Sequence, residues 1–93
     1  MTFTKSDIIE MGEALIDGYQ LRISKGGVLV DWYSDCLKSC LELQGELKKE
    51  NLNREDIRRL VDIMKKEYAT AKPPVIGYWC CRVEDFLNYN EDL

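Results

Sequence analysis

The stretch from Tyr19 to Trp32, YQLRISKGGVLVDW, constrains the fold most, because its two halves mirror each other about a pair of glycines. A two-residue turn at Lys25-Gly26 would bring the halves together as a β-hairpin with one apolar face. A slip of one residue would scramble that face, so the apolar pattern also fixes the register of the pairing. The facing pairs on the apolar side would be Ile23 with Val28, Leu21 with Val30, and Tyr19 with Trp32.

The sequence predicts a single α+β domain over residues 1–93, in which a small antiparallel sheet packs on two or three helices. The sheet would consist of the hairpin 19–32 and a third strand over 75–83, VIGYWCCRV, which is rich in β-branched and aromatic residues. A lone hairpin is only marginally stable in water, so the third strand and covering helices are physically needed.

Three helices are predicted from capping residues and apolar spacing. Thr4 and Asp7 resemble a capping box that opens a helix over 5–17, and Gly18 suits its end. Ser34 would cap a second helix over 35–49. Asn53 would cap a third, which Pro73-Pro74 prevents from continuing.

A different periodicity supports an all-α alternative. Six residues recur at spacings of three or four, as they would along one long helix that begins near Val28. The pair Gly26-Gly27 and the three matched cross-strand pairs favour the hairpin over this helix. The six residues are Leu29, Trp32, Cys36, Cys40, Leu43 and Leu47.

The residue types argue against catalysis and against a metal or cofactor site. The chain has no histidine, which removes the commonest general base and excludes Ser-His and Cys-His nucleophile pairs. No Gly-rich phosphate loop or organised carboxylate pair is present, so we expect a protein that is not an enzyme. The four cysteines, Cys36, Cys40, Cys80 and Cys81, lack the C-x-x-C pairs of zinc sites. Their spacing favours buried, inert thiols over zinc ligands or redox-active thiols.

The charge indicates which kind of partner to expect. The net charge is −4, which disfavours direct binding to nucleic acid. No signal peptide or membrane-spanning run is apparent, so the expected location is the cytoplasm. These features are typical of a small acidic binding or inhibitory protein, of the kind that a virus or mobile element encodes. Such a protein would contact a larger protein, for example by blocking the basic groove of a nucleic-acid-binding enzyme.

Eight residues are candidates for partner contact, and they lie in three places. Four belong to the expected hairpin or follow it directly, two to the third helix, and two to the segment after the proline pair. If the hairpin face made the contact, the chain would be a docking or adaptor module. If the locally basic third helix did, it would be a replication or transcription accessory factor. The residues are Arg22, Leu29, Asp31 and Tyr33; Arg58 and Arg59; and Tyr78 and Trp79.

The run ALIDGYQLRISKGGVL, within residues 10–32, resembles the helix-hairpin opening of TubC-type N-terminal docking domains. The resemblance implies a small αββαα module whose hairpin surface grips a short acidic segment of a partner synthase. The long second helix and the YWCC segment depart from that family. The matching positions are Leu15, Gly18, Leu21, Ile23, Gly26, Gly27 and Leu29.

Overall fold

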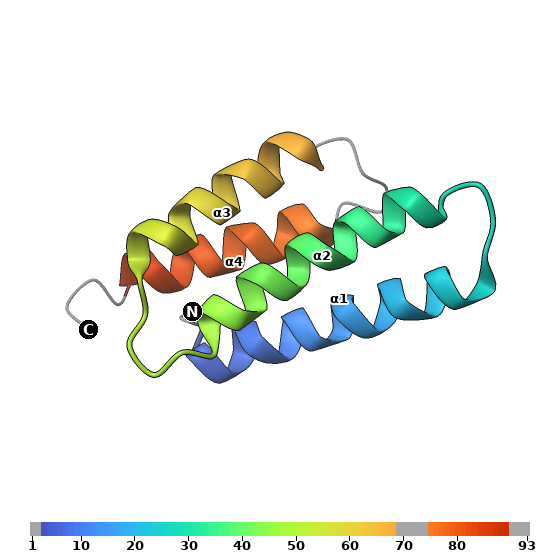
Figure 1. Ribbon diagram of the computed structural model, residues 1–93. Helices are drawn as coiled ribbons and strands as arrows, with labels where there is room; N and C mark the ends of the chain where they lie inside the picture. Colours follow the sequence, from blue (N-terminus) through green and yellow to red (C-terminus); the bar gives the residue numbers. More distant parts are fainter. Residues whose placement is uncertain (1–2, 69–74, 90–93) are drawn as a thin grey trace.

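The computed structural model describes residues 3–68 and 75–89, and every regular element within these ranges is an α-helix. Each helix packs against the two that neighbour it around a ring, in the order α1, α2, α3, α4 and back to α1 (Figure 1). The described chain is therefore a four-helix bundle. Its helices are α1 (Lys5–Lys25), α2 (Val30–Leu47), α3 (Arg54–Glu67) and α4 (Val75–Tyr89).

The prediction of an α+β fold is therefore wrong, and the all-α alternative is the one that the structure shows. The expected hairpin over 19–32 is absent, although the chain does reverse direction where the turn was expected. Gly26 and Gly27 have φ angles of 74° and 113°, which favour glycine, and they join two antiparallel helices instead of two strands. The position of the chain reversal is therefore as predicted, but helices flank it where strands were predicted.

Helix α1 continues beyond the predicted end at residue 17, because Gly18 lies inside the helix and not at its cap. Its start is as expected. The Asp7 amide donates a hydrogen bond to the Thr4 hydroxyl oxygen at 3.1 Å, and the Thr4 amide donates to the Asp7 carboxylate at 3.0 Å. One buried stripe, Ile8, Gly12, Ile16 and Tyr19, runs through the glycine at helical spacing.

Helix α2 starts earlier than predicted. Its N-cap is Leu29, which makes no side-chain capping bond, so the assignment of Ser34 as the cap is wrong. The apolar stripe that supported the all-α alternative forms the core-facing side of this helix. Cys36, Cys40, Leu43 and Leu47 from that stripe are fully buried, whereas Leu29 and Trp32 reach the surface.

Helix α3 begins as predicted, since the Asn53 side chain accepts a hydrogen bond from the Asp56 amide at 3.1 Å. Helix α4 replaces the strand predicted over 75–83. The buried residues of α4 recur at helical spacing and pack on both α3 and α1, and this stripe outweighs the local β propensity. Pro73-Pro74 lies outside the described residues. The buried residues of α4 are Ile76, Trp79, Cys80, Val83, Phe86 and Leu87.

A close contact around Gly12 holds α2 and α4 against α1. The buried Gln44 carboxamide of α2 donates to the Ile9 carbonyl at 2.8 Å and to the Glu13 carboxylate at 3.1 Å. The Trp79 indole N–H of α4 donates to the Ile8 carbonyl at 2.8 Å. The Gln44 and Trp79 side chains fit here only because Gly12 has no Cβ. This one glycine therefore sets the spacing of α1, α2 and α4.

Candidate functional site

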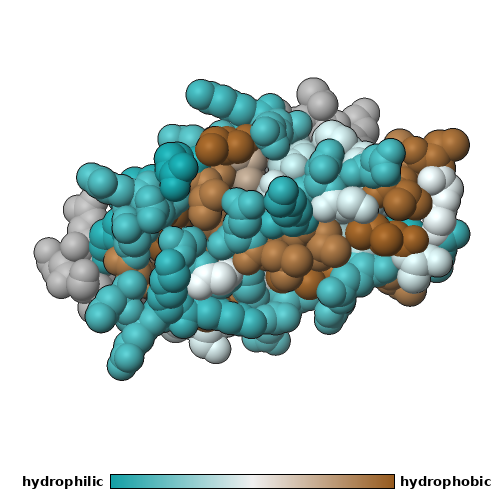
Figure 2. Space-filling model, in the orientation of Figure 1, coloured by the Kyte–Doolittle hydropathy of each residue, from teal (hydrophilic) through white to brown (hydrophobic). Residues whose placement is uncertain are grey.

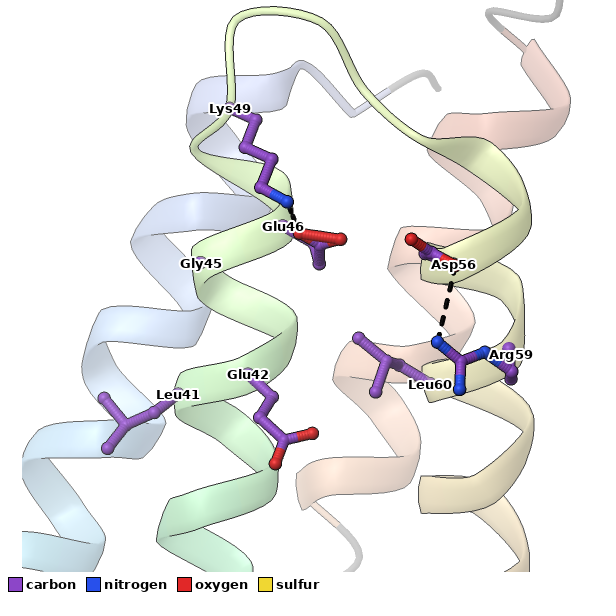
Figure 3. Close-up of a pocket in the computed structure, with 8 residues that line it drawn as sticks. All are labelled: Leu41, Glu42, Gly45, Glu46, Lys49, Asp56, Arg59 and Leu60. Atoms are coloured by element: carbon purple, nitrogen blue, oxygen red, sulfur yellow. Dashed lines mark hydrogen bonds and ion pairs between the residues drawn. The ribbon is translucent and has the colours of Figure 1, made fainter.

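A groove runs along the surface between α2 and α3, and we call it the α2–α3 groove. It consists of two hollows, of about 570 Å³ and about 400 Å³, which share Glu42. The larger, aromatic hollow is lined by Trp32, Asp35, Lys38, Ser39, Glu42, Ile63, Glu67 and Tyr68. The smaller, distal hollow is lined by Leu41, Glu42, Gly45, Glu46, Lys49, Asp56, Arg59 and Leu60 (Figure 3).

Two aromatic side chains define the aromatic hollow. The Trp32 ring meets the Tyr68 ring edge-on, with 5.3 Å between centroids and an angle of 73° between planes. The Tyr68 hydroxyl is 3.1 Å from the Ser39 hydroxyl, which joins α3 to α2. Tyr68 is buried, whereas 37% of Trp32 remains exposed. The indole of Trp32 therefore offers an accessible aromatic surface held in a defined position.

Negative charge gathers around this aromatic surface. Within the described residues, the carboxylates of Asp35, Glu42 and Glu67 make no hydrogen bond or ion pair, and Lys38 is the only cation that lines the hollow. Burial raises the pKa of the Tyr68 hydroxyl, and the charges of Glu67 and Asp35 act in the same direction. The aromatic hollow is thus suited to a positively charged group.

The distal hollow has a different electrostatic character, because four of its five charged side chains are already paired with one another. Glu46 forms an ion pair with Lys49, and Asp56 forms one with Arg59 at 3.4 Å, both marked in Figure 3. The Glu42 side chain extends into the space between the two helices (Figure 3). The unpaired negative charge of the groove is therefore concentrated at its aromatic end.

The predicted contact residues near the α1–α2 turn do not form a hairpin face. The Arg22 guanidinium lies over the rings of Tyr19 and Tyr33, 5.7 Å and 5.8 Å from their centroids. Leu29 is 51% exposed, and Figure 2 shows apolar side chains gathered at this end of the molecule. Asp31 is exposed and Tyr33 is half-buried. The hairpin surface that the TubC-type resemblance implies is absent.

The other predicted residues are also dispersed. The Arg58 guanidinium donates to the Asn88 side chain at 3.3 Å, and Arg59 pairs with Asp56, so both predicted arginines of α3 already have partners. Tyr78 is 54% exposed, but Trp79 is fully buried and belongs to the core. The structure therefore does not bring the eight predicted residues together on one surface.

The carboxylates of the aromatic hollow are not among the predicted contact residues, although the sequence carries a signal for them. Trp32, Asp35, Ser39 and Glu42 recur at spacings of three and four residues, which places them on one side of a helix. The predicted strand that ends at Trp32 separates this residue from Asp35, Ser39 and Glu42, so the prediction does not group the four. Glu67 comes from α3, so only the packing of the two helices shows that it joins this group.

Three of the four cysteines are buried and one is exposed. Burial raises the pKa of the Cys40 and Cys80 thiols to about 12 and also raises the pKa of Cys36, whereas Cys81 faces solvent. In the described part of the chain, no cluster of three metal-ligating side chains occurs.

The cysteine arrangement predicts selective labelling. Because the thiolate is the reactive form, we expect one thiol of the native protein, Cys81, to react promptly with an aromatic disulfide reagent at mildly alkaline pH. All four should react in denaturant. The count is read from reagent absorbance, and a Cys81→Ser variant should lose the prompt phase. Prompt labelling of two or more thiols in the native protein would contradict the burial described here.

No protein-family model, curated protein or solved structure matches this chain. Among the described helices, none combines the length and apolar character that crossing a membrane requires. The candidate site is therefore supported by its geometry and charge alone.

Proposed function

We propose that this chain is a binding protein, and that the aromatic hollow of the α2–α3 groove docks on a basic surface of a larger protein. The observation that carries the proposal is the set of three unpaired carboxylates around the exposed Trp32 indole. A lysine or arginine of the partner would stack on Trp32 and approach Asp35 and Glu67. A cation over an exposed indole contributes about 0.5–1 kcal/mol, so this anchor gives specificity within a wider interface.

The overall charge supports the same kind of partner. With a net charge of −4, the chain is attracted to basic surfaces at long range, which raises the association rate at low salt. Surfaces that bind nucleic acid carry dense lysine and arginine. We therefore propose a nucleic-acid-binding enzyme as the partner, and inhibition by occupation of its basic groove as the outcome.

The test uses a tetra-arginine peptide as the probe and compares two charge-neutralised variants. One carries Asp35→Asn, Glu42→Gln and Glu67→Gln in the aromatic hollow. The matched control carries Asp17→Asn, Glu50→Gln and Asp62→Asn, which removes the same charge from exposed positions outside the hollow. Binding is measured by calorimetry and by tryptophan fluorescence over a salt series.

We expect the variant of the aromatic hollow to bind the peptide at least about tenfold more weakly than wild type, and the control to stay within about threefold. Wild-type affinity should fall steeply as salt rises, because charge pairs dominate the contact. Equal weakening in both variants would mean that net charge alone attracts the peptide, and the proposed site would then be wrong. Affinity that does not change with salt would also contradict it.

A further inference from the structure

A hollow of about 430 Å³ lies at the surface between α1 and α4, and we call it the α1–α4 hollow. It shares no residue with either hollow of the α2–α3 groove. Small-molecule sites have volumes of about 300–1,000 Å³ and mostly apolar walls with a few placed polar groups, so this hollow has the character of a ligand site. Its one charged lining residue is Arg22, and the others are Met11, Ala14, Leu15, Gly18, Tyr78 and Trp79.

The floor of the α1–α4 hollow is apolar and belongs to the bundle. Trp79 is fully buried, and Met11 and Leu15 are half-buried residues that pack against the core. The lining residues of α1 run from Met11 to Arg22, which is about three turns of helix, or roughly 16 Å along its axis. A trough of this length suits an extended hydrocarbon chain better than a compact group.

The Tyr78 ring forms a wall of the hollow and is fixed in position. The Arg82 guanidinium lies 5.1 Å from the centroid of this ring, and Arg82 is itself held by an ion pair with Asp85 at 3.2 Å. Across from Tyr78, Ala14 and Gly18 of α1 have almost no side chain, which keeps the space open. Because 54% of Tyr78 is exposed, a ligand can reach a ring that is already ordered, and binding then costs less entropy.

Arg22 provides a cation at one end of the hollow. Within the described chain, no ion pair neutralises it, and no carboxylate lines the hollow. Its guanidinium lies 5.7 Å and 5.8 Å from the centroids of the Tyr19 and Tyr33 rings, and 3.2 Å from where a Cβ on Gly18 would be. These contacts hold the guanidinium beside the trough. A guanidinium binds a carboxylate through two parallel hydrogen bonds, so this end of the hollow suits an anionic head group.

We propose that the α1–α4 hollow binds a small amphipathic carboxylate, such as a medium-chain fatty acid. The carboxylate binds the Arg22 guanidinium, and the hydrocarbon tail lies along α1 toward Met11, against the Tyr78 ring. The tail removes from water the apolar surface of the hollow that is exposed in the free protein, which favours binding. Charge and length together select this ligand, because the only charged lining residue stands at one end of a long apolar trough.

Calorimetry with decanoate, kept below its micellar concentration, tests the proposal. Decanoate is ionised at neutral pH, whereas decanol carries the same tail without the charge. We expect saturable binding of decanoate to wild type and no binding of acetate, which lacks the tail. Arg22→Gln should weaken decanoate binding at least about tenfold and change decanol binding less than about threefold, because it removes only the charged contact.

The matched control is Lys25→Gln, which removes the same charge from an exposed position of α1 outside the hollow and should leave decanoate binding within about threefold of wild type. A second variant tests the shape of the hollow. Ala14→Phe should abolish the binding of both ligands by filling the space, whereas Gln20→Phe, at an exposed position of α1 outside the hollow, should not. Circular dichroism checks that each variant is folded, and the charge comparison decides the question if Ala14→Phe is not.

A decanoate that carries bromine at the end of its tail locates the bound ligand, because bromine quenches an indole that it contacts. In a Trp32→Phe variant the remaining indole, Trp79, borders the hollow and should be quenched. A wild type that shows no saturable decanoate binding would overturn the proposal. Equal weakening by Arg22→Gln and Lys25→Gln, or an unquenched Trp79, would do the same. None of these outcomes depends on whether the α2–α3 groove binds a basic partner.

Discussion

Replacing Gly12 with alanine is expected to destabilise the folded protein by about 2–4 kcal/mol, as overpacking and a broken buried hydrogen bond together predict. The added Cβ would lie 2.4 Å from the Gln44 side-chain oxygen and 2.5 Å from an indole carbon of Trp79. Neither neighbour can move freely, because each donates a hydrogen bond to an α1 carbonyl. The measurement is urea unfolding followed by circular dichroism.

The matched control is Gly45→Ala, the same substitution inside α2. A Cβ at Gly45 would meet no atom within 4 Å, so only helix propensity acts there. We expect this variant to gain about 0.5–1 kcal/mol, since alanine favours helix over glycine by that amount. The two variants should therefore shift the unfolding midpoint in opposite directions. A midpoint that rises for Gly12→Ala would show that α1, α2 and α4 do not meet at this residue.

The sequence predicts where helices start and where the chain turns better than it predicts the elements between these points. The capping residues Thr4 and Asn53 start helices as predicted, and the chain reverses at Gly26-Gly27. Caps and glycine turns are local, so their physical cause lies within a few residues.

The choice between strand and helix was wrong because local residue types conflict with the periodicity of burial. Alternating apolar residues on both sides of Gly26 fit a strand, and β-branched or aromatic residues fill the start of α4. In the bundle, each helix is stabilised by the stripe of buried residues that packs against the neighbouring helices, and the spacing of this stripe decides between helix and strand. Trp79, Cys80 and Val83 are all fully buried, and a strand with only one face against the helices could not bury the adjacent residues Trp79 and Cys80 together.

The candidate site was harder to predict, because it combines residues from two helices. Asp35 and Glu42 lie on α2 and Glu67 lies on α3, so their grouping follows only from the packing of α2 against α3.

The second large effect is expected at Trp79, whose side chain is fully buried where α4 meets α1. Trp79→Ala should cost about 3–5 kcal/mol, because it removes the largest buried side chain and leaves a cavity. Small domains have a total stability of only about 5–15 kcal/mol, so this variant should be partly unfolded at ambient temperature or melt far below wild type. Trp79→Phe keeps an aromatic ring but loses the hydrogen bond to Ile8. Its free energy of unfolding should lie between those of wild type and Trp79→Ala.

Trp32→Ala provides the matched control, because it removes the other tryptophan from a partly exposed position. The loss of Trp32 should lower the free energy of unfolding less than the loss of Trp79 does, because 37% of Trp32 is exposed in the folded protein and only part of its surface is buried. Its edge-on contact with Tyr68 adds about 1 kcal/mol beyond that buried area. Each alanine variant retains one indole, so fluorescence during urea unfolding reports on Trp32 in one protein and on Trp79 in the other. If Trp32→Ala proved as damaging as Trp79→Ala, the indole of the aromatic hollow would be part of the core. Removing an indole lowers the stability only slightly when the indole lies at the surface. This comparison therefore also decides whether Trp32 is free to contact a partner.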